Sequence, residues 1–492
     1  MRYTMPEGGK ASAGLSKVHD FMRGKASAGF SKVDDFMRSP LYVVFIACLS
    51  VLSSVFGLEL IVYSIFVAIG VYLCIWGDDL LPLMPIVVCS YIAPSFVNNP
   101  GRNPESIFYP AHGGIYLLVL AAIFVACLIF RLVTDRDFGG MTFLRKKRSL
   151  TAGMLVLGVA YVLGGFGIEN YTSYAANTVL FGFIQFVSVF LMYYVFSGTI
   201  KWEKAPRDYF AWIGLCVGFV VLVQLSENYI SGRIFMEGGN TIDRELMATG
   251  WGMHNNIGGL MAMMMPFPFY LAYTRKRSWV YIALASVLML GVVISCSRTA
   301  MLAGAIVFFV CSVLLLRKRE KRGPILVVYA VAAVAVGVFA VVSFEKLKDV
   351  FALFIEEIDA ISKRDLLFIN GMKQFREYPV FGGTFYPQGD FIPWDWAELE
   401  AFSTFFPPRW HNTLVQIAAS CGVVGLTAYV FHRVQTVQLF LRHRSVENFF
   451  IGMFVVTLLA AGLLDNHFFN VGPVLVYSMA LAFVENIDQS KV

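Results

Sequence analysis

Two arginines and a histidine are the residues of this chain whose types could do chemistry together. Arg298 lies between two apolar runs in the sequence CSRTAM, Arg364 lies in a long polar segment, and His411 opens a later apolar run in RWHNTLVQ. A guanidinium group binds phosphate through paired donors, and histidine accepts a proton near neutral pH. The combination predicts an anion-binding site beside a general base.

The composition places these residues in a membrane protein. The chain has 492 residues, of which 58% are hydrophobic and 15% are charged, whereas soluble domains are about 45–50% apolar and about 25% charged. A soluble globular enzyme is therefore excluded. The eight cysteines are scattered through apolar stretches without a CxxC pair. We interpret them as small buried side chains, with no disulfide framework and no metal site.

The apolar runs predict an all-α polytopic membrane protein with about 14 transmembrane helices, because ~20 apolar residues cross the hydrocarbon core. We expect the spans at 41–56, 58–76, 80–97, 113–133, 150–167, 177–197, 209–226, 257–274, 279–295, 299–316, 324–343, 411–431, 449–464 and 470–486. The expected organisation is a tail (1–40), helices 1–11 (41–343) with a loop at 227–256, a large loop (344–410) and helices 12–14 (411–492).

Lysines and arginines predict the orientation of these spans. Basic runs at 145–148, 275–277 and 317–322 fall on the same side of the predicted bundle, and the positive-inside rule makes this side the cytoplasm. Both termini are then cytoplasmic, and the loops at 227–256 and 344–410 are extracytoplasmic. Arg298 and His411 share the extracytoplasmic boundary, where we expect the active site.

The N-terminal tail contains a duplication. Residues 9–23 and 24–38 are identical at thirteen of fifteen positions. The tail lacks the apolar core and the cleavage site of a signal peptide. We interpret it as a dispensable cytoplasmic segment; the alternative is a basic amphipathic helix on an anionic membrane surface or on a partner.

Each candidate residue also has an ordinary explanation. An arginine near a membrane boundary more often extends its charge to lipid phosphate than binds a substrate, and this holds for Arg244 more than for Arg298. A histidine that opens a helix is usually an interfacial or capping residue. Ten aromatic residues between 381 and 410 form either an interfacial belt or surfaces on which sugars stack. Only the combination of arginines and histidine favours a site.

Four segments, in this order, resemble the O-antigen ligase and polymerase superfamily of bacterial surface-polysaccharide assembly. They are Arg244 followed by HNNIGGLMAMMMPF at 254–267, SRTAMLAGA at 297–305, SKRDLLFINGMKQFREYPVFGGTF at 362–385, and HNTLVQIAASCG at 411–422. The resemblance implies a multi-pass protein of the bacterial cytoplasmic membrane. Its implied reaction transfers a glycan from a polyprenyl-pyrophosphate donor to a sugar hydroxyl of a glycan, glycolipid or protein acceptor, and it leaves ligase and polymerase open.

The resemblance also implies roles for single residues. Arg298 and Arg364 would stabilise the pyrophosphate leaving group, which gains charge as the glycosidic bond breaks. His411 would take the proton of the acceptor hydroxyl, so that the acceptor attacks directly and inverts the anomeric carbon. The Asn412 amide would position a phosphate or the base. The implied substrate-binding residues are Arg244, Asn256, Trp410 and Asn412.

No metal or cofactor is expected at this site. The Asp-x-Asp sequence at Asp135 and Asp137 and the pair Asp78–Asp79 fall on predicted cytoplasmic connections, so they cannot serve an outward reaction. The main rival function is transport, by a lipid-linked oligosaccharide flippase or another multi-span transporter. Such proteins need ionisable groups in mid-span, and the predicted spans carry few, so we favour the enzyme.

Overall fold

The computed structural model describes residues 32–99, 103, 105–134, 150–168, 171–235, 242–243, 246–342, 361–385 and 410–487. The expected all-helical fold is confirmed for these residues, which contain no strand. Several predictions fall on residues outside this set: the tail up to residue 31, Asp135, Asp137, the basic run at 145–148, Arg244 and most of the loop at 344–410 with its aromatic residues.

An apolar helix coincides with every expected span. The helices are α2 (Pro40–Phe56), α3 (Glu59–Ile75), α4 (Leu83–Ile92), α5 (Ile115–Thr134), α7 (Thr151–Val162), α8 (Tyr171–Phe186), α9 (Met192–Thr199), α10 (Tyr209–Ile230), α11 (His254–Met264), α12 (Pro266–Thr274), α13 (Ser278–Ile294), α14 (Arg298–Leu316), α15 (Arg322–Val342), α17 (Ile361–Glu377), α18 (Thr413–Arg442), α19 (Val446–Gly462) and α20 (Val471–Ile487). A short 3-10 turn, η9 (His467–Phe469), precedes α20.

Six helical segments of the described chain are long and apolar enough to cross a membrane. Two of them, 179–199 and 254–274, join helices that a local irregularity divides: a π turn between α8 and α9, and Pro266 between α11 and α12. Proline interrupts the helix because it has no N–H to donate. Seven further apolar helices of the described chain are shorter, at 10–17 residues. The membrane class follows from these helices, while the total of fourteen spans stays a prediction.

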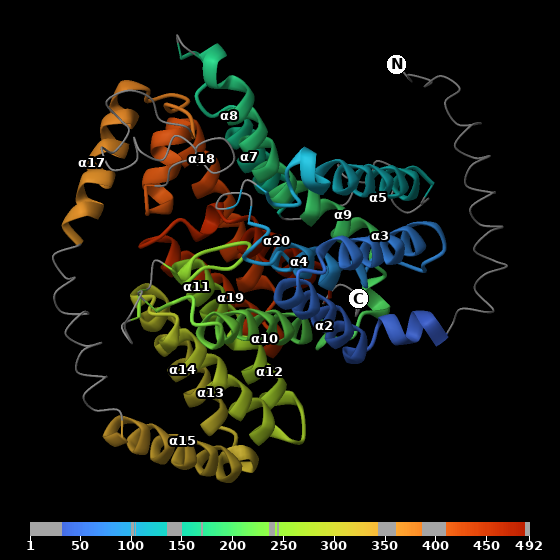
Figure 1. Cartoon of the computed structure of the whole chain (residues 1–492), viewed down its shortest axis with the longest axis vertical. Helices are drawn as coiled ribbons and strands as arrows, with labels where there is room; N and C mark the ends of the chain where they lie inside the picture. Colours follow the sequence, from blue (N-terminus) through green and yellow to red (C-terminus); the bar gives the residue numbers. More distant parts are fainter. Residues whose placement is uncertain are drawn as a thin grey trace.

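The centre of the bundle is formed by α10, α11 and α12. In the most apolar 18-residue stretch of each candidate span, 89% of the residues are buried in 254–274 and 72% in 209–230. The corresponding share is 17% in the span that contains α5. Glycine allows the close packing: a Cβ at Gly218 would meet the Leu288 side chain of α13 at 3.2 Å. Figure 1 shows α5 and α15 towards the outside of the bundle, on different sides.

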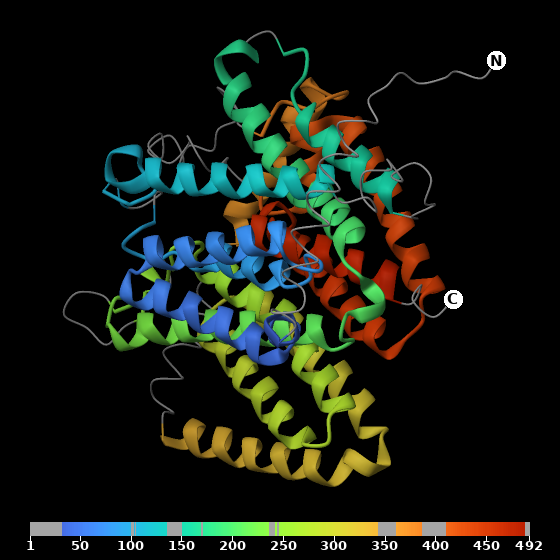
Figure 2. The same cartoon turned by 90° about the vertical axis from the view of Figure 1, so that its right-hand side faces the viewer.

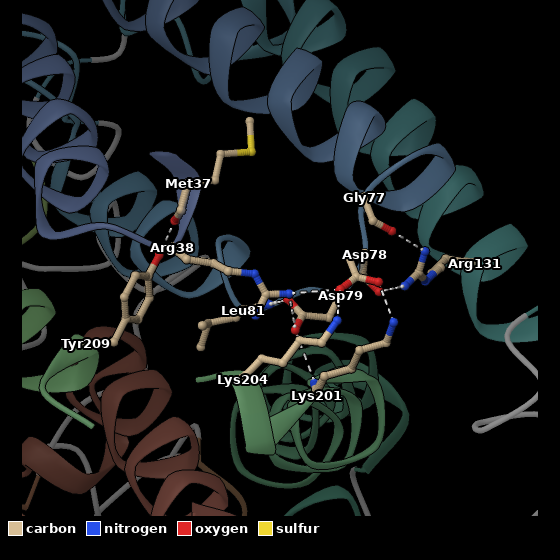
Figure 3. A network of polar contacts seen from close by, with 10 residues as sticks. All are labelled: Met37, Arg38, Gly77, Asp78, Asp79, Leu81, Arg131, Lys201, Lys204 and Tyr209. Atoms are coloured by element: carbon tan, nitrogen blue, oxygen red, sulfur yellow. Dashed lines mark hydrogen bonds and ion pairs between the residues drawn. The ribbon is translucent and has the colours of Figure 1, made fainter. Parts of the chain in front are cut away.

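Connections with basic residues meet at one end of the bundle. Figure 3 shows Arg38, Lys201 and Lys204 around the carboxylates of Asp78 and Asp79. Arg38 Nη2 lies 2.8 Å from Asp79 Oδ2, and Lys204 Nζ lies 3.1 Å from Asp78 Oδ2. Burial opposes ionisation of Asp78, but the hydrogen bonds from Lys201 and Lys204 lower its pKa to about 2. The carboxylates are therefore occupied by cations of this chain.

The candidate site lies at the other end of α10. The Tyr209 hydroxyl, at the start of this helix, donates to Met37 O at 3.0 Å, next to the cluster of Figure 3. Tyr229, near the end of the helix, donates to Ile294 O at 2.5 Å, four residues before Arg298. The 22 residues of α10 span about 33 Å. The Asp78–Asp79 pair is thus separated from Arg298 by roughly the thickness of a bilayer core.

Candidate active site

His411 occupies an unusual backbone position that is fixed on both sides. Its φ is +50°, a left-handed value that non-glycine residues rarely adopt. The N–H of Trp410 donates to Gln416 Oε1 at 3.0 Å, which holds the preceding residue. The side chain of Asn412 caps α18 by accepting from the N–H groups of Leu414 and Val415 at 2.9 and 3.1 Å. The cost of the left-handed conformation is therefore offset by these neighbours.

A carboxylate lies next to the histidine. His411 Nδ1 is 3.4 Å from Asp465 Oδ1, in the turn between α19 and α20. Asp465 is buried, and 30% of the His411 side chain remains exposed. Burial of the Asp465 carboxyl opposes its ionisation, but His411 and His467 together hold its pKa well below the usual range. Nδ1 makes no hydrogen bond within the described structure, so the contact is electrostatic. A carboxylate at this position stabilises positive charge on the imidazole and leaves Nε2 for a substrate.

Buried amides hold this turn against α18. Asn466 Nδ2 donates to Gln416 Oε1 at 2.7 Å, and both side chains are fully buried or nearly so. Asn412 Nδ2 donates to Leu463 O at 2.8 Å, so the amide that caps α18 also holds the end of α19. The Asn412 amide is thus engaged at both its oxygen and its nitrogen. Its observed contacts position His411 relative to Asp465.

Arg298 is the first residue of α14. Ser297 caps the helix by accepting from the N–H of Ala300 at 3.4 Å, and Arg298 is partly buried. The turn before Arg298 packs on α11, where Gly258 leaves no room for a side chain. A Cβ at Gly258 would meet the Cβ atoms of Ser297 and Ala300 at 3.0 Å. The first turn of α14 is therefore in direct contact with α11.

The next glycine of α11, Gly259, faces the turn between α19 and α20 that carries Asp465. A Cβ at Gly259 would meet the His467 imidazole, with Nε2 at 2.7 Å and Nδ1 at 3.2 Å. Three residues earlier on α11, Asn256 Oδ1 accepts from Asn470 Nδ2 at 2.9 Å. Helix α11 thus contacts the Arg298 turn through one glycine and the turn that carries Asp465 through the adjacent one. This arrangement brings Arg298, Asn256 and His411 to the same end of the bundle.

Trp410 lies at the junction of α17 with α18. Trp410 is 1% exposed and packs on Gly371 of α17, where a Cβ would meet its ring at 3.2 Å. Gln374 Nε2 donates to Ala419 O at 3.0 Å across the same junction. Arg364 lies in the first turn of α17, in a part whose side chains are outside the described set. The helix rises about 20 Å from Arg364 to Glu377, so Arg364 lies far from the end of α17 that is next to the bonded residues 379 and 380.

The end of α17 is attached where α18 is interrupted. Gly422 has φ +62° and ψ −156°, which breaks the helical hydrogen bonding of α18. The freed N–H groups of Val423 and Val424 donate to Pro379 O and Val380 O at 2.8 and 3.2 Å. The Pro-x-x-Gly segment at 379–382 is therefore bonded directly to α18.

The helices α11, α14, α18 and α20 begin at this end. A helix N-terminus carries a partial positive charge and favours an anion. Together with Arg298, these N-termini suit a negatively charged group next to His411. Within the part of the chain that the structure describes, no group of three His, Cys, Asp or Glu side chains could hold a metal ion.

Sequence reasoning missed Asp465, Asn466, Gln416 and His467 as members of this site. The sequence LLDNHFFN at 463–470 places four polar residues between two apolar runs. That interruption is the signal that could have singled out Asp465, because a short turn between two spans needs few polar residues.

Comparison with known proteins gives one family. Residues 283–430 match the sequence model of the family described as O-Antigen ligase. The matched segment runs from α13 to residue 430 within α18 and includes Arg298 and His411. No curated protein matches the chain.

Proposed function

We propose that this chain, which matches the O-antigen ligase family over residues 283–430, is a membrane glycan ligase or polymerase. The proposed reaction moves a glycan from a polyprenyl-pyrophosphate donor to a sugar hydroxyl on a glycan, glycolipid or protein acceptor. The observation that supports it most is the pairing of His411 with Asp465 at an end of the bundle where α11, α14, α18 and α20 begin. That end offers a base and a positive environment together.

In the proposed step, His411 Nε2 removes the proton of the acceptor hydroxyl as the oxygen attacks the anomeric carbon of the donor sugar. A new glycosidic bond forms, and the bond from the anomeric carbon to the pyrophosphate oxygen breaks. The leaving polyprenyl pyrophosphate carries the released negative charge, which Arg298 and the helix N-termini stabilise. Asp465 stabilises the imidazolium that forms. Attack from the face opposite the leaving group inverts the anomeric carbon.

The remaining candidates have proposed roles around this step. Arg364 and Arg244 add positive charge to the pyrophosphate, and Asn256 contacts the donor or acceptor. The observed contacts of Trp410 and Asn412 favour positioning of His411 over direct substrate binding. The proposed orientation places this end on the extracytoplasmic face of a bacterial cytoplasmic membrane, with both chain termini in the cytoplasm and no metal in the reaction.

The test uses purified protein mixed with lipid-linked repeat units in EDTA, with product length read on gels. We expect chain growth or capping in the wild type and its loss in His411→Ala and Arg298→Ala. The matched controls are His112→Ala, an exposed histidine, and Arg317→Ala, an exposed arginine at the other end of α14. Unchanged product in both site variants would remove the assignment of the site.

Two further outcomes would change the proposed function itself. A strict requirement for added metal would remove the metal-independent mechanism. In proteoliposomes, movement of lipid-linked glycan across the bilayer without any change of bonds would favour the flippase.

A further inference from the structure

Helix α18 extends eleven residues beyond the expected end of its span at 431, so that Arg433 lies inside a helix instead of in a connection. Arg433 is surrounded by aromatic rings. Its Cζ lies 4.3 Å from the ring centroid of Phe468, 4.5 Å from that of Tyr429 and 5.1 Å from that of Tyr477. A guanidinium group is attracted to the faces of such rings.

The hydrogen bonds of Arg433 are incomplete. Nη1 donates to the Tyr477 hydroxyl at 2.7 Å. Nε and Nη2 are shielded from solvent and form no hydrogen bond of good geometry with the described residues, although the Tyr429 hydroxyl lies close enough to interact with the guanidinium. Arg433 forms no ion pair with a carboxylate of that part of the chain. A buried cation with unsatisfied donors is costly in a membrane-spanning helix. The donors Nε and Nη2 therefore indicate a ligand that supplies hydrogen-bond acceptors and negative charge.

The positions of the two donors, Nε and Nη2, indicate which chemical group the ligand carries. Nε–H and one Nη2–H point along the same edge of a planar guanidinium, the edge that binds two oxygens of one anion. Nearby, the buried hydroxyl of Tyr161, on α7, also has no hydrogen-bond partner in the described chain. A phosphate group offers paired oxygens for the guanidinium edge and a further oxygen for a hydroxyl.

The surroundings of Arg433 indicate how such an anion would arrive. On the same stretch of α18, Val430, Val434 and Val437 are 58%, 49% and 57% exposed, and this helix is a candidate membrane span. An apolar exposed face suits lipid, and a phosphate carried by an amphiphile reaches such a surface more easily than a free anion does.

We propose that the free edge of Arg433 is a binding site for the phosphate group of a membrane amphiphile. The site lies behind the turn that carries Asp465: Phe468 of that turn stacks on Arg433, while Asp465 contacts His411. The proposal does not depend on the proposed glycan transfer, because binding can be measured without any reaction.

The binding experiment uses the full-length protein in a neutral maltoside detergent and dodecyl phosphate as the probe, with bound probe counted in native mass spectra. We expect saturable binding by the wild type. Arg433→Lys keeps the charge but loses the paired donors, and it should weaken binding about tenfold. The matched control Arg442→Lys changes an exposed arginine of the same helix and should bind like the wild type.

Three results would overturn the proposal. Equal affinity of the wild type and Arg433→Lys would remove Arg433 from the site. Competition by inorganic phosphate at the same concentration as dodecyl phosphate would show that the ligand is a free anion and not an amphiphile. Equal binding of dodecanol and dodecyl phosphate by the wild type would show that no phosphate is recognised, and this comparison needs no variant to fold.

Discussion

Replacing Gly259 by alanine should displace the turn that carries Asp465. The added Cβ would lie 2.7 Å from His467 Nε2 and closer still to Cε1, whereas ordinary contact begins at 3.4 Å. His467 is 1% exposed, so its ring has no open space to enter. Since Cε1 would lie at 2.4 Å, the ring, or α11, has to move by about 1 Å. Because Asp465 is two residues away, its 3.4 Å contact with His411 should lengthen.

The size of the effect follows from packing and from geometry. An extra methyl group in a packed interior costs about 1–3 kcal/mol, so the free energy of unfolding of Gly259→Ala should fall by about that amount. A misplacement of about 1 Å in a reacting group costs about 10²-fold in rate. We therefore expect glycan transfer per folded molecule to fall about 100-fold. Thermal unfolding in detergent and the lipid-linked donor assay measure the two quantities separately.

The matched control is Gly452→Ala in α19, where a Cβ would meet only the Phe440 ring, at 3.6 Å. This substitution should leave the transfer rate unchanged and should not destabilise the helix, since alanine is the better helix former. Wild-type transfer by a folded Gly259→Ala protein would refute the argument that α11 sets the relation between Asp465 and His411.

Three further predictions concern charged residues. Asp465→Asn should lower the transfer rate about 10²–10⁴-fold at saturating donor, because the imidazolium of His411 loses its carboxylate; a rate within threefold of wild type would contradict this role. The stability difference between wild type and Asp465→Asn should be full above about pH 5 and shrink below about pH 4, because the pKa of folded Asp465 is held below the unfolded value of ~3.9. Thermal unfolding across pH measures it, and a difference that does not vary with pH would count against it. Asp79→Asn, which removes a buried partner of Arg38, should lower the free energy of unfolding by about 3 kcal/mol and leave transfer per folded molecule unchanged.

The positions of the helices could be predicted because each apolar run had to become a helix to satisfy its backbone in a membrane. Helix α18 continues past the expected end of its span. That span, 411–431, ends before Arg433, since a charge in a span is costly. The rings of Tyr429, Phe468 and Tyr477 and one tyrosine hydroxyl offset that cost. Two of these rings come from segments distant in sequence, and no local pattern announces them.

The candidate site could be predicted only in part for a similar reason. Arg298 and His411 were found because each stands at a polar boundary of an apolar run. Asp465 lies 54 residues after His411, and its relation to the histidine depends on how α18 and α19 pack. Gln416 appeared to be an isolated polar residue in a span, yet its carboxamide oxygen joins Trp410 to Asn466. Such pairings depend on tertiary contacts that composition and spacing do not encode.

The interruption of α18 at Gly422 has a mechanical consequence. Since the backbone donors just after it are bonded to residues 379 and 380, the helix consists of two rods joined at a pivot. The rod before Gly422 begins next to His411 and is bonded at Ala419 O to Gln374 of α17. The rod after Gly422 is bonded at its start to residues 379 and 380, and further along through Gln435 to α7. A displacement of α17 would therefore act on both rods at the pivot, and the histidine would move with the first of them.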